Sequence, residues 1–218
     1  MKKIYYIVVV FAILFLAGCG DGIDLPGVNV ETDLNKIPLP DNNVNLEQVE
    51  LKPSTEPMLH EGLHTEEDFQ RIRDKKAAVE EPWVSAYQLL VESQFSQKTA
   101  DTYPTEWIKR GVSGDENYMN AARGATIVYQ QALRWKIEQD DEYAAKAVEN
   151  LNKWVQTCVG VTGNTNLSLA AGLYGYEFAI AGELLRDYGG WDRADFAACQ
   201  NWLLKVFYPA NDDFLKRH

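Results

Sequence analysis

The stretch that decides the fold is residues 166–187, NLSLAAGLYGYEFAIAGELLRD. Its large apolar side chains cover most of the circumference of a helix instead of one stripe: Leu167, Leu169, Leu173, Tyr174, Phe178, Ile180, Leu184 and Leu185. A helix that is apolar nearly all round is one that its neighbours bury. We therefore expect a long, buried inner helix near 166–187.

The segments on either side of this stretch have the periodicity of amphipathic helices. Apolar side chains recur at helical spacing near 116–138 and again near 141–158, and the polar turn Gln139-Asp140-Asp141 separates the two. Another helix starts at Trp191-Asp192. We expect these helices to form hairpins in which an amphipathic outer helix alternates with a more buried inner one.

Two shorter helices are expected before them. Thr65-Glu66-Glu67-Asp68 has the form of a capping box, and Glu81-Pro82-Trp83 places proline at the first position of a second helix. Residues 96–116 then form a long loop, and a loop of this length in a compact domain is often functional. Because no run of residues is convincing as a strand, the sequence predicts an all-α domain of antiparallel helical hairpins over residues 58–218.

The amino end of the chain has the form of a bacterial lipoprotein signal. Met1-Lys2-Lys3 is positively charged, and Ile4–Leu16 is an apolar run that is too short to span a bilayer, which needs about 20 apolar residues. The run ends in Leu16-Ala17-Gly18-Cys19, the pattern of a lipobox. We predict a signal peptide over residues 1–18, lipid on Cys19, and anchoring to a membrane facing the periplasm or the cell surface. The alternatives are an ordinary signal peptide with a chance cysteine and an uncleaved anchor.

Residues 19–57 are rich in Asn, Asp, Gly and Pro without sustained periodicity, which predicts a flexible tether between the lipid and the helical domain. The chain has a net charge of −11, and removal of residues 1–18 would make it −13 because Lys2 and Lys3 are lost. Nucleic-acid binding needs clustered Lys and Arg, so a protein this acidic is a poor candidate for it. A protein this acidic is also a poor candidate for electrostatic binding to anionic lipid surfaces, because such surfaces attract basic segments.

The sequence lacks the motifs of common metal, nucleotide and hydrolase sites: HExxH, CxxC, a Gly-rich phosphate loop and GxSxG. His60 and His64 have the i, i+4 spacing of a helical metal pair, but Gly62 lies between them and the helix starts only afterwards, so we expect no metal site. Cys158 and Cys199 stand on apolar helix faces. Export would permit a disulfide bond between them, and two buried thiols are the alternative.

From Gly62 onward the chain resembles the amino-terminal part of the alginate lyase family. The resemblance rests on Leu63-His64-Thr65, Glu81-Pro82-Trp83, YQQALRWKI at 129–137, AVENLNKW at 147–154, Gly163-Asn164, AGLYGYEFA at 171–179, Arg186-Asp187-Tyr188 and the segment from Phe207 to His218. It implies a polysaccharide lyase with an α/α-toroid fold, an acidic polysaccharide as substrate and no cofactor.

A closed toroid needs more hairpins than the three found here. The resemblance therefore implies an incomplete toroid, in which the last two helices expose apolar faces and most catalytic positions lie beyond residue 218. On this basis we expect the chain to be a fragment, with His218 as the first residue of the catalytic site and Arg217 as a substrate-binding neighbour.

The family chemistry, β-elimination on a uronate, implies further candidates for substrate binding. The amides of Asn164 and Asn166 suit a carboxylate, although a turn residue and a helix cap are the alternative roles. Tyr174 and Tyr176 suit sugar stacking or proton transfer, and their alternative is the core. Glu177 on an apolar helix needs a partner, either substrate or a structural group such as an arginine.

The sequence thus supports two functions. The first is a lipid-anchored polysaccharide lyase that acts on alginate or a glucuronan-like polymer. The second is a non-enzymatic glycan-binding or scaffold lipoprotein built of helical repeats. Against the second, the helices near 116 and 166 start roughly 50 residues apart, whereas the tetratricopeptide repeat has a period of about 34.

Overall fold

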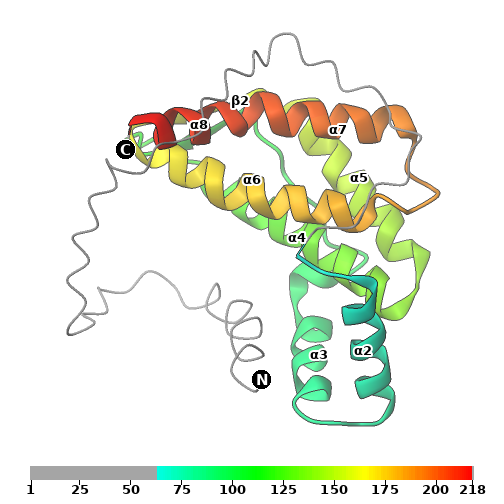
Figure 1. Ribbon diagram of the computed structural model, residues 1–218. Helices are drawn as coiled ribbons and strands as arrows, with labels where there is room; N and C mark the ends of the chain where they lie inside the picture. The colour runs from blue at the N-terminus through cyan, green and yellow to red at the C-terminus, as the bar shows by residue number, and fades with distance from the viewer. Residues whose placement is uncertain (1–62, 218) are drawn as a thin grey trace, which may run out of the picture. The chain divides into compact units, whose positions relative to one another are not determined.

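The computed structural model describes residues 63–217 (Figure 1). The predicted signal peptide, the lipidation site Cys19, the tether 19–57 and the candidate catalytic residue His218 lie outside the described residues. The described part is mostly helical, and its elements in chain order are α2 (Glu66–Ala77), α3 (Trp83–Glu92), the 3-10 turn η3 (Gln94–Ser96), β1 (Trp107–Arg110), α4 (Tyr118–Glu138), α5 (Asp141–Thr157), β2 (Gly160–Gly163), α6 (Asn166–Leu185), α7 (Arg193–Val206) and α8 (Tyr208–Arg217).

Side-chain caps define several of the helix starts. The Thr65 side chain accepts a hydrogen bond from the backbone N–H of Asp68, while the Asp68 carboxylate accepts one from the backbone N–H of Thr65, so the predicted capping box is confirmed. Asp140 and Asp192 cap α5 and α7 in the same manner, by accepting from the N–H groups two residues further on. These caps fix where α2, α5 and α7 start, and Gln139, in the left-handed backbone conformation, ends α4 directly before the Asp140 cap.

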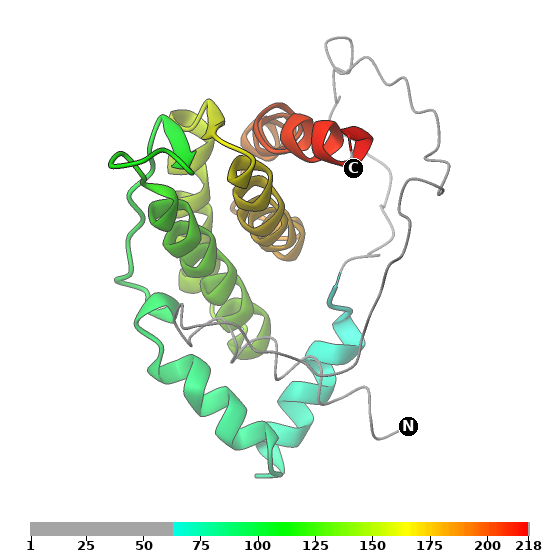
Figure 2. The same ribbon diagram turned by 90° about the vertical axis from the view of Figure 1, so that its left-hand side faces the viewer.

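The core lies where α4 packs against both α5 and α6 (Figure 2). Its largest members are aromatic: the Phe178 ring lies 5.4 Å from that of Trp154 and 5.2 Å from that of Trp202, measured between ring centroids. Gly175 allows α6 to approach Phe207 closely, since a Cβ atom there would lie 2.7 Å from the Phe207 ring. The predicted helical hairpins are confirmed, whereas the complete or partial toroid stays a prediction.

The expectation of an all-α domain was wrong in one respect, because β1 and β2 form a small parallel sheet. Trp107 pairs with Gly160 and Arg110 pairs with Gly163. Each strand has four residues, which is too short for an alternating pattern, and Gly160–Gly163 has the composition of a loop. The pairing itself joins segments about fifty residues apart, so no local pattern could indicate it.

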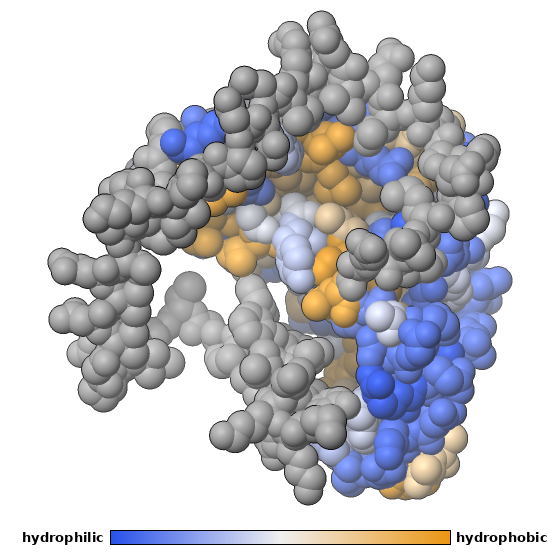
Figure 3. Space-filling view, in the orientation of Figure 1, coloured by the Kyte–Doolittle hydropathy of each residue, from blue (hydrophilic) through white to orange (hydrophobic). Residues whose placement is uncertain are grey.

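The expectation that α6 is buried all round was also wrong. Leu169 is 47% exposed and Tyr176 is 58% exposed, whereas Tyr174 and Phe178 are buried. One face of α6 therefore reaches the surface. Figure 3 shows hydrophobic side chains on the face that includes α6, while the surface over α2 and α3 is strongly hydrophilic. In addition, the segment after Phe207 forms a separate helix, α8, which the periodicity did not predict.

Candidate functional site

A row of polar side chains runs along the seam between α4 and α6. On α4, Tyr118, Thr126 and Tyr129 share one face, because 8 and 11 residues correspond to about two and three helical turns. On α6, Tyr174 and Glu177 are one turn apart. Arg110 lies at one end of this row and His64 at the other. We call the whole set the seam strip; its members are His64, Arg110, Tyr118, Thr126, Tyr129, Tyr174 and Glu177.

Arg110, the last residue of β1, occupies one end of the seam strip. Its Nη1 donates a hydrogen bond of 3.0 Å to the Tyr174 hydroxyl, and its guanidinium lies 4.5 Å from the centroid of the Tyr118 ring. The two tyrosine rings are stacked with centroids 6.5 Å apart. Within residues 63–217 no carboxylate forms an ion pair with Arg110, although most other cations of this part do. Arg110 is thus positioned to bind an anion from outside the protein.

The predicted amide residues lie next to Arg110. Gly163 pairs with Arg110 in the sheet, and Asn164 follows it directly. The Asn164 side chain packs over Gly111, where a Cβ atom would overlap it. Its Oδ1 accepts a hydrogen bond of 2.9 Å from the backbone N–H of Asn166, which forms an Asx turn before α6. Asn164 and Asn166 are both exposed, so the alternative role of Asn164 as a turn residue is confirmed. Asn166 is not the cap, because that position belongs to Thr165.

His64 and Tyr129 form the opposite end of the seam strip. A hydrogen bond of 2.7 Å joins His64 Nε2 to the Tyr129 hydroxyl, and the two rings are stacked with centroids 6.0 Å apart. Burial lowers the pKa of His64, and nearby Asp68 only partly opposes this. Burial also raises the pKa of Tyr129, with a further contribution from the charge of Glu177. Near pH 7 the pair is therefore a neutral imidazole and a protonated phenol, which suit a general base and a general acid.

Glu177 lies between the two ends. It is partly buried, and burial raises its pKa to about 7, while a hydrogen bond with Thr126 acts in the opposite direction. The sequence predicted that the Glu177 carboxyl binds either substrate or a structural group such as an arginine. Among the described residues, its hydrogen-bond partner is the hydroxyl of Thr126. At neutral pH the carboxyl is present in both protonated and ionised forms. A protonated carboxyl can donate a hydrogen bond to another carboxylate, whereas the ionised form repels one.

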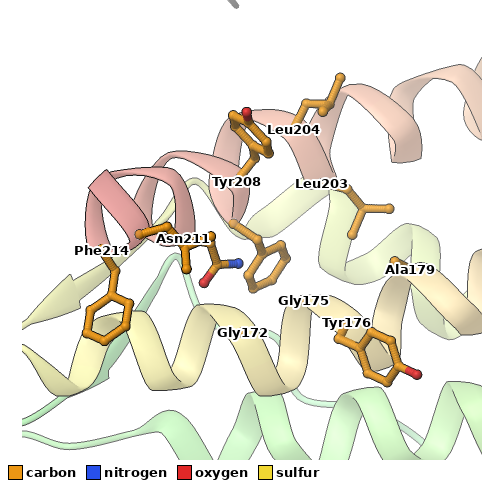
Figure 4. Close-up of a pocket in the computed structure, with 11 residues that line it drawn as sticks. Gly172, Gly175, Tyr176, Ala179, Leu203, Leu204, Tyr208, Asn211 and Phe214 are labelled. Atoms are coloured by element: carbon orange, nitrogen blue, oxygen red, sulfur yellow. The ribbon is translucent and has the colours of Figure 1, made fainter. Parts of the chain in front are cut away.

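Tyr176 connects the seam strip with an apolar groove. It follows Tyr174 by two residues and directly precedes Glu177 on α6, so its backbone lies beside the seam strip. Its ring lines a groove of about 540 Å³ between α6, α7 and α8. In Figure 4, Tyr176 lies along the α6 side of this groove, while Tyr208 and Phe214 extend from α8. The core alternative is therefore wrong for Tyr176. For Tyr174, which is 7% exposed, it is confirmed.

Comparison with known families identifies the chain. A family model described as alginate lyase matches residues 72–211. The chain belongs to the alginate lyase family. No curated protein and no solved structure matches it. Membership implies a polysaccharide lyase with an acidic polysaccharide as substrate.

The matched range contains every member of the seam strip except His64. In this alginate lyase family member, Arg217 is the last residue of α8 and His218 lies outside the described residues, so their roles stay predictions.

Cys158 and Cys199 are both buried free thiols, and burial raises their pKa values to about 11 and about 12.

Residues 63–217 contain no group of three His, Cys, Asp or Glu side chains that could hold a metal ion. In the same part of the chain, no helix is both long enough and apolar enough to cross a membrane.

Several members of the seam strip were not predicted as site residues. His64 was correctly placed outside a helix, but its contact with Tyr129 spans 65 residues and has no local signal. Arg110 lay in a segment interpreted as loop, and its role depends on the pairing of β1 with β2. For Thr126 and Tyr129 a signal existed, because polar side chains shared the otherwise apolar face of this family member's longest helix.

Proposed function

We propose that this protein is a lipid-anchored polysaccharide lyase that cleaves a uronate polymer, alginate or a glucuronan-like chain, by β-elimination. The observation that carries the proposal is the hydrogen-bonded pair of His64 and Tyr129, in a strip that also holds Arg110, which forms no ion pair with a carboxylate of residues 63–217. The lipobox ending at Cys19 supports the anchor. Family membership supports the reaction class.

The pair has the protonation states that β-elimination requires. The neutral imidazole of His64 takes the proton from C5 of the uronate, the electron pair forms the C4–C5 double bond, and the C4–O4 bond breaks. The Tyr129 hydroxyl donates its proton to the departing oxygen. Because His64 Nε2 is joined to the Tyr129 hydroxyl, the imidazole takes the C5 proton at Nδ1 and passes its Nε2 proton to the Tyr129 oxygen. The neutral imidazole then carries its proton on Nδ1, and exchange with water returns it to Nε2 without a cofactor.

The substrate carboxylate must be neutralised before its C5 proton becomes acidic. In the proposal the protonated form of Glu177 does this by sharing its proton with the carboxylate at the reacting sugar. Arg110 is too far away for that role, since Tyr118 beneath it and Tyr129 are separated along α4 by roughly 16 Å. Arg110, with the Asn164 amide beside it, instead holds the carboxylate of another sugar of the same chain. The exposed Tyr176 ring supplies a stacking surface near the reacting sugar.

The test is incubation of the full chain, purified in detergent, with sodium alginate and separately with glucuronan. A lyase produces an unsaturated sugar whose double bond absorbs in the ultraviolet. We expect this absorbance to rise for one of the polymers and to stay flat for the His64→Asn variant. A matched control is Lys205→Gln, an exposed residue of α7, which should leave the rate unchanged. Binding of either polymer without unsaturated product would contradict the lyase and favour the non-enzymatic glycan-binding lipoprotein.

A further inference from the structure

A second groove lies on the other side of α4 from the seam strip. It has a volume of about 250 Å³ and lies between α4 and the chain that follows η3. On α4 it is lined by Asn120, Arg123 and Ile127, which point about half a turn away from Tyr118 and Tyr129 at 3.6 residues per turn. The groove is therefore separate from the proposed catalytic site.

The groove carries polar and aromatic groups that have no partner in the described part of the chain. Arg123 is exposed and forms no ion pair or hydrogen bond within residues 63–217. The side-chain amide of Asn120 and the hydroxyl of Tyr103 are likewise without partners there, and Tyr103 is 76% exposed. A planar cation, an amide and an exposed aromatic ring along one groove provide ion pairing, hydrogen bonding and stacking together.

The acidic residue that lines this groove is paired with lysines and not with Arg123. The carboxylate of Asp101, which also lines the groove, lies 2.7 Å from Lys153 Nζ and 3.0 Å from Lys146 Nζ. Hydrogen bonds from these two lysines hold the pKa of Asp101 below its usual value. Glu149 pairs with the same lysines. These two carboxylates are thus balanced by two ammonium groups, and the charge of Arg123, the other charged residue that lines the groove, is not used to neutralise Asp101.

The wall of the groove that carries Tyr103 is held in place by buried side chains. Gln131 and Asn150, both 0% exposed, donate hydrogen bonds of 3.1 and 3.0 Å to the carbonyl oxygen of Ala100. Trp154 Nε1 donates one of 2.5 Å to the hydroxyl of Thr102. Residues 100–103 are therefore anchored to α4 and α5. An anchored loop presents Tyr103 with little further loss of conformational entropy on binding.

We propose that this groove is a second, non-catalytic binding site for an acidic polysaccharide. The Tyr103 ring stacks on a sugar face, Arg123 pairs with a uronate carboxylate, and the Asn120 amide binds a hydroxyl or carboxylate oxygen. The ligand class rests on the proposed function. Occupation of this site keeps a long polymer near the molecule while another part of it occupies the seam strip, which raises the local substrate concentration.

The experiment separates binding from turnover. Retardation of the full chain in native gels containing sodium alginate is compared for the wild type, Arg123→Gln, Tyr103→Ala and Lys205→Gln. We expect the first two variants to bind alginate several-fold more weakly, and Lys205→Gln, which removes one exposed positive charge elsewhere, to bind as the wild type does. Gels containing dextran, a neutral polymer, should retard none of them. Circular dichroism of each variant verifies that it is folded.

Two results would overturn the second site. One is retardation of Arg123→Gln and Tyr103→Ala equal to that of the wild type, and the other is a loss in Lys205→Gln as large as theirs. Because retardation needs no turnover, these results are independent of whether unsaturated product forms. If product forms with short oligosaccharides at equal rates in the wild type and Arg123→Gln, while alginate binding falls in Arg123→Gln, both proposals stand.

Discussion

The Tyr129 hydroxyl lies 2.7 Å from Nε2 of His64, although the two residues are 65 positions apart in the chain. The contact exists because Thr65 and Asp68 define the start of α2, which places the residue just before the helix against α4. Proton transfer between the two groups requires this short distance, so the proposed chemistry depends on the capping box that positions His64.

Removal of the Tyr129 hydroxyl tests the proposed general acid. Tyr129→Phe keeps the ring stacked on His64 and removes only the proton donor, so we expect turnover to fall by roughly 100-fold or more. The free energy of unfolding should change by only about 1 kcal/mol, the contribution of one hydrogen bond. Both are measured on the same preparation, by ultraviolet absorbance and by urea unfolding. Tyr188→Phe, which removes a hydroxyl outside the seam strip, is the matched control. Turnover above half of the wild-type value in Tyr129→Phe would rule out the assigned role.

Glu177 predicts a pH dependence of stability. Its pKa is about 7 in the folded protein and about 4.5 in the unfolded chain. Between these pH values the unfolded chain has released the proton and the folded protein has not. The free energy of unfolding therefore falls as the pH rises from 4.5 to 7, by at most about 3 kcal/mol from this group. In Glu177→Gln this fall should be absent.

His64 contributes in the opposite sense. Because its pKa is lowered in the folded protein, the free energy of unfolding decreases as the pH falls below the usual pKa of histidine.

The effect of Glu177 is isolated by urea unfolding of the wild type and Glu177→Gln across this pH range. His64 is present in both proteins, so its contribution cancels in the difference. Glu106→Gln, a change in an exposed loop residue, controls for the loss of one negative charge. A difference between wild type and Glu177→Gln that does not vary with pH would show that the carboxyl has no raised pKa.

Arg110 is predicted to act on substrate binding more than on the chemical step. Arg110→Gln removes a positive charge that lies about three helical turns from Tyr129. An interaction at that distance is made equally in the ground state and the transition state. We therefore expect KM to rise by roughly tenfold and kcat to change much less. The effect should shrink for oligosaccharides too short to reach both ends of the seam strip. Steady-state kinetics against chain length gives both quantities. An equal loss of kcat for the shortest cleaved substrate would place Arg110 at the reacting sugar instead.

Packing between α6 and the chain after α7 is tested at Gly175. A Cβ atom there would lie 2.7 Å from the Phe207 ring, which is itself buried against Phe178 and Trp202. We expect Gly175→Ala to lower the free energy of unfolding by about 1–3 kcal/mol, because overpacking forces the ring or the helix to move. Gly189→Ala is the matched control, since a Cβ atom at Gly189 would have no neighbour within 4 Å. Equal stability of the two variants in thermal unfolding would contradict the packing described here.

Much of the helical architecture could be predicted because it depends on local patterns. The segment near 116–138 became α4 at Tyr118–Glu138, and that near 141–158 became α5 at Asp141–Thr157. Apolar periodicity and caps act over a few residues, so they are readable without tertiary contacts. The β1–β2 pairing was missed because it joins distant segments that are each only four residues long.

For the candidate site, the sequence identified residue types but not their neighbours. Glu177 was recognised as unusual on an apolar helix and Tyr174 as a candidate for sugar stacking or proton transfer, and both belong to the seam strip. Whether Tyr176 is core or surface could not be decided, because a helix that is apolar all round gives no indication of which face its neighbours cover; the packing of α7 and α8 leaves Tyr176 exposed.

The sequence by itself determined the helices, their caps, the resemblance to the alginate lyase family and the lipobox that predicts the anchor, since each of these is a property of adjacent residues. Only the tertiary structure decided that His64 contacts Tyr129, that Arg110 lies over Tyr118 with no ion pair to a carboxylate of the described residues, and that Glu177 is buried enough to raise its pKa to about 7. The physical reason is that hydrogen bonds between distant segments and the removal of water from a side chain exist only after the helices have packed.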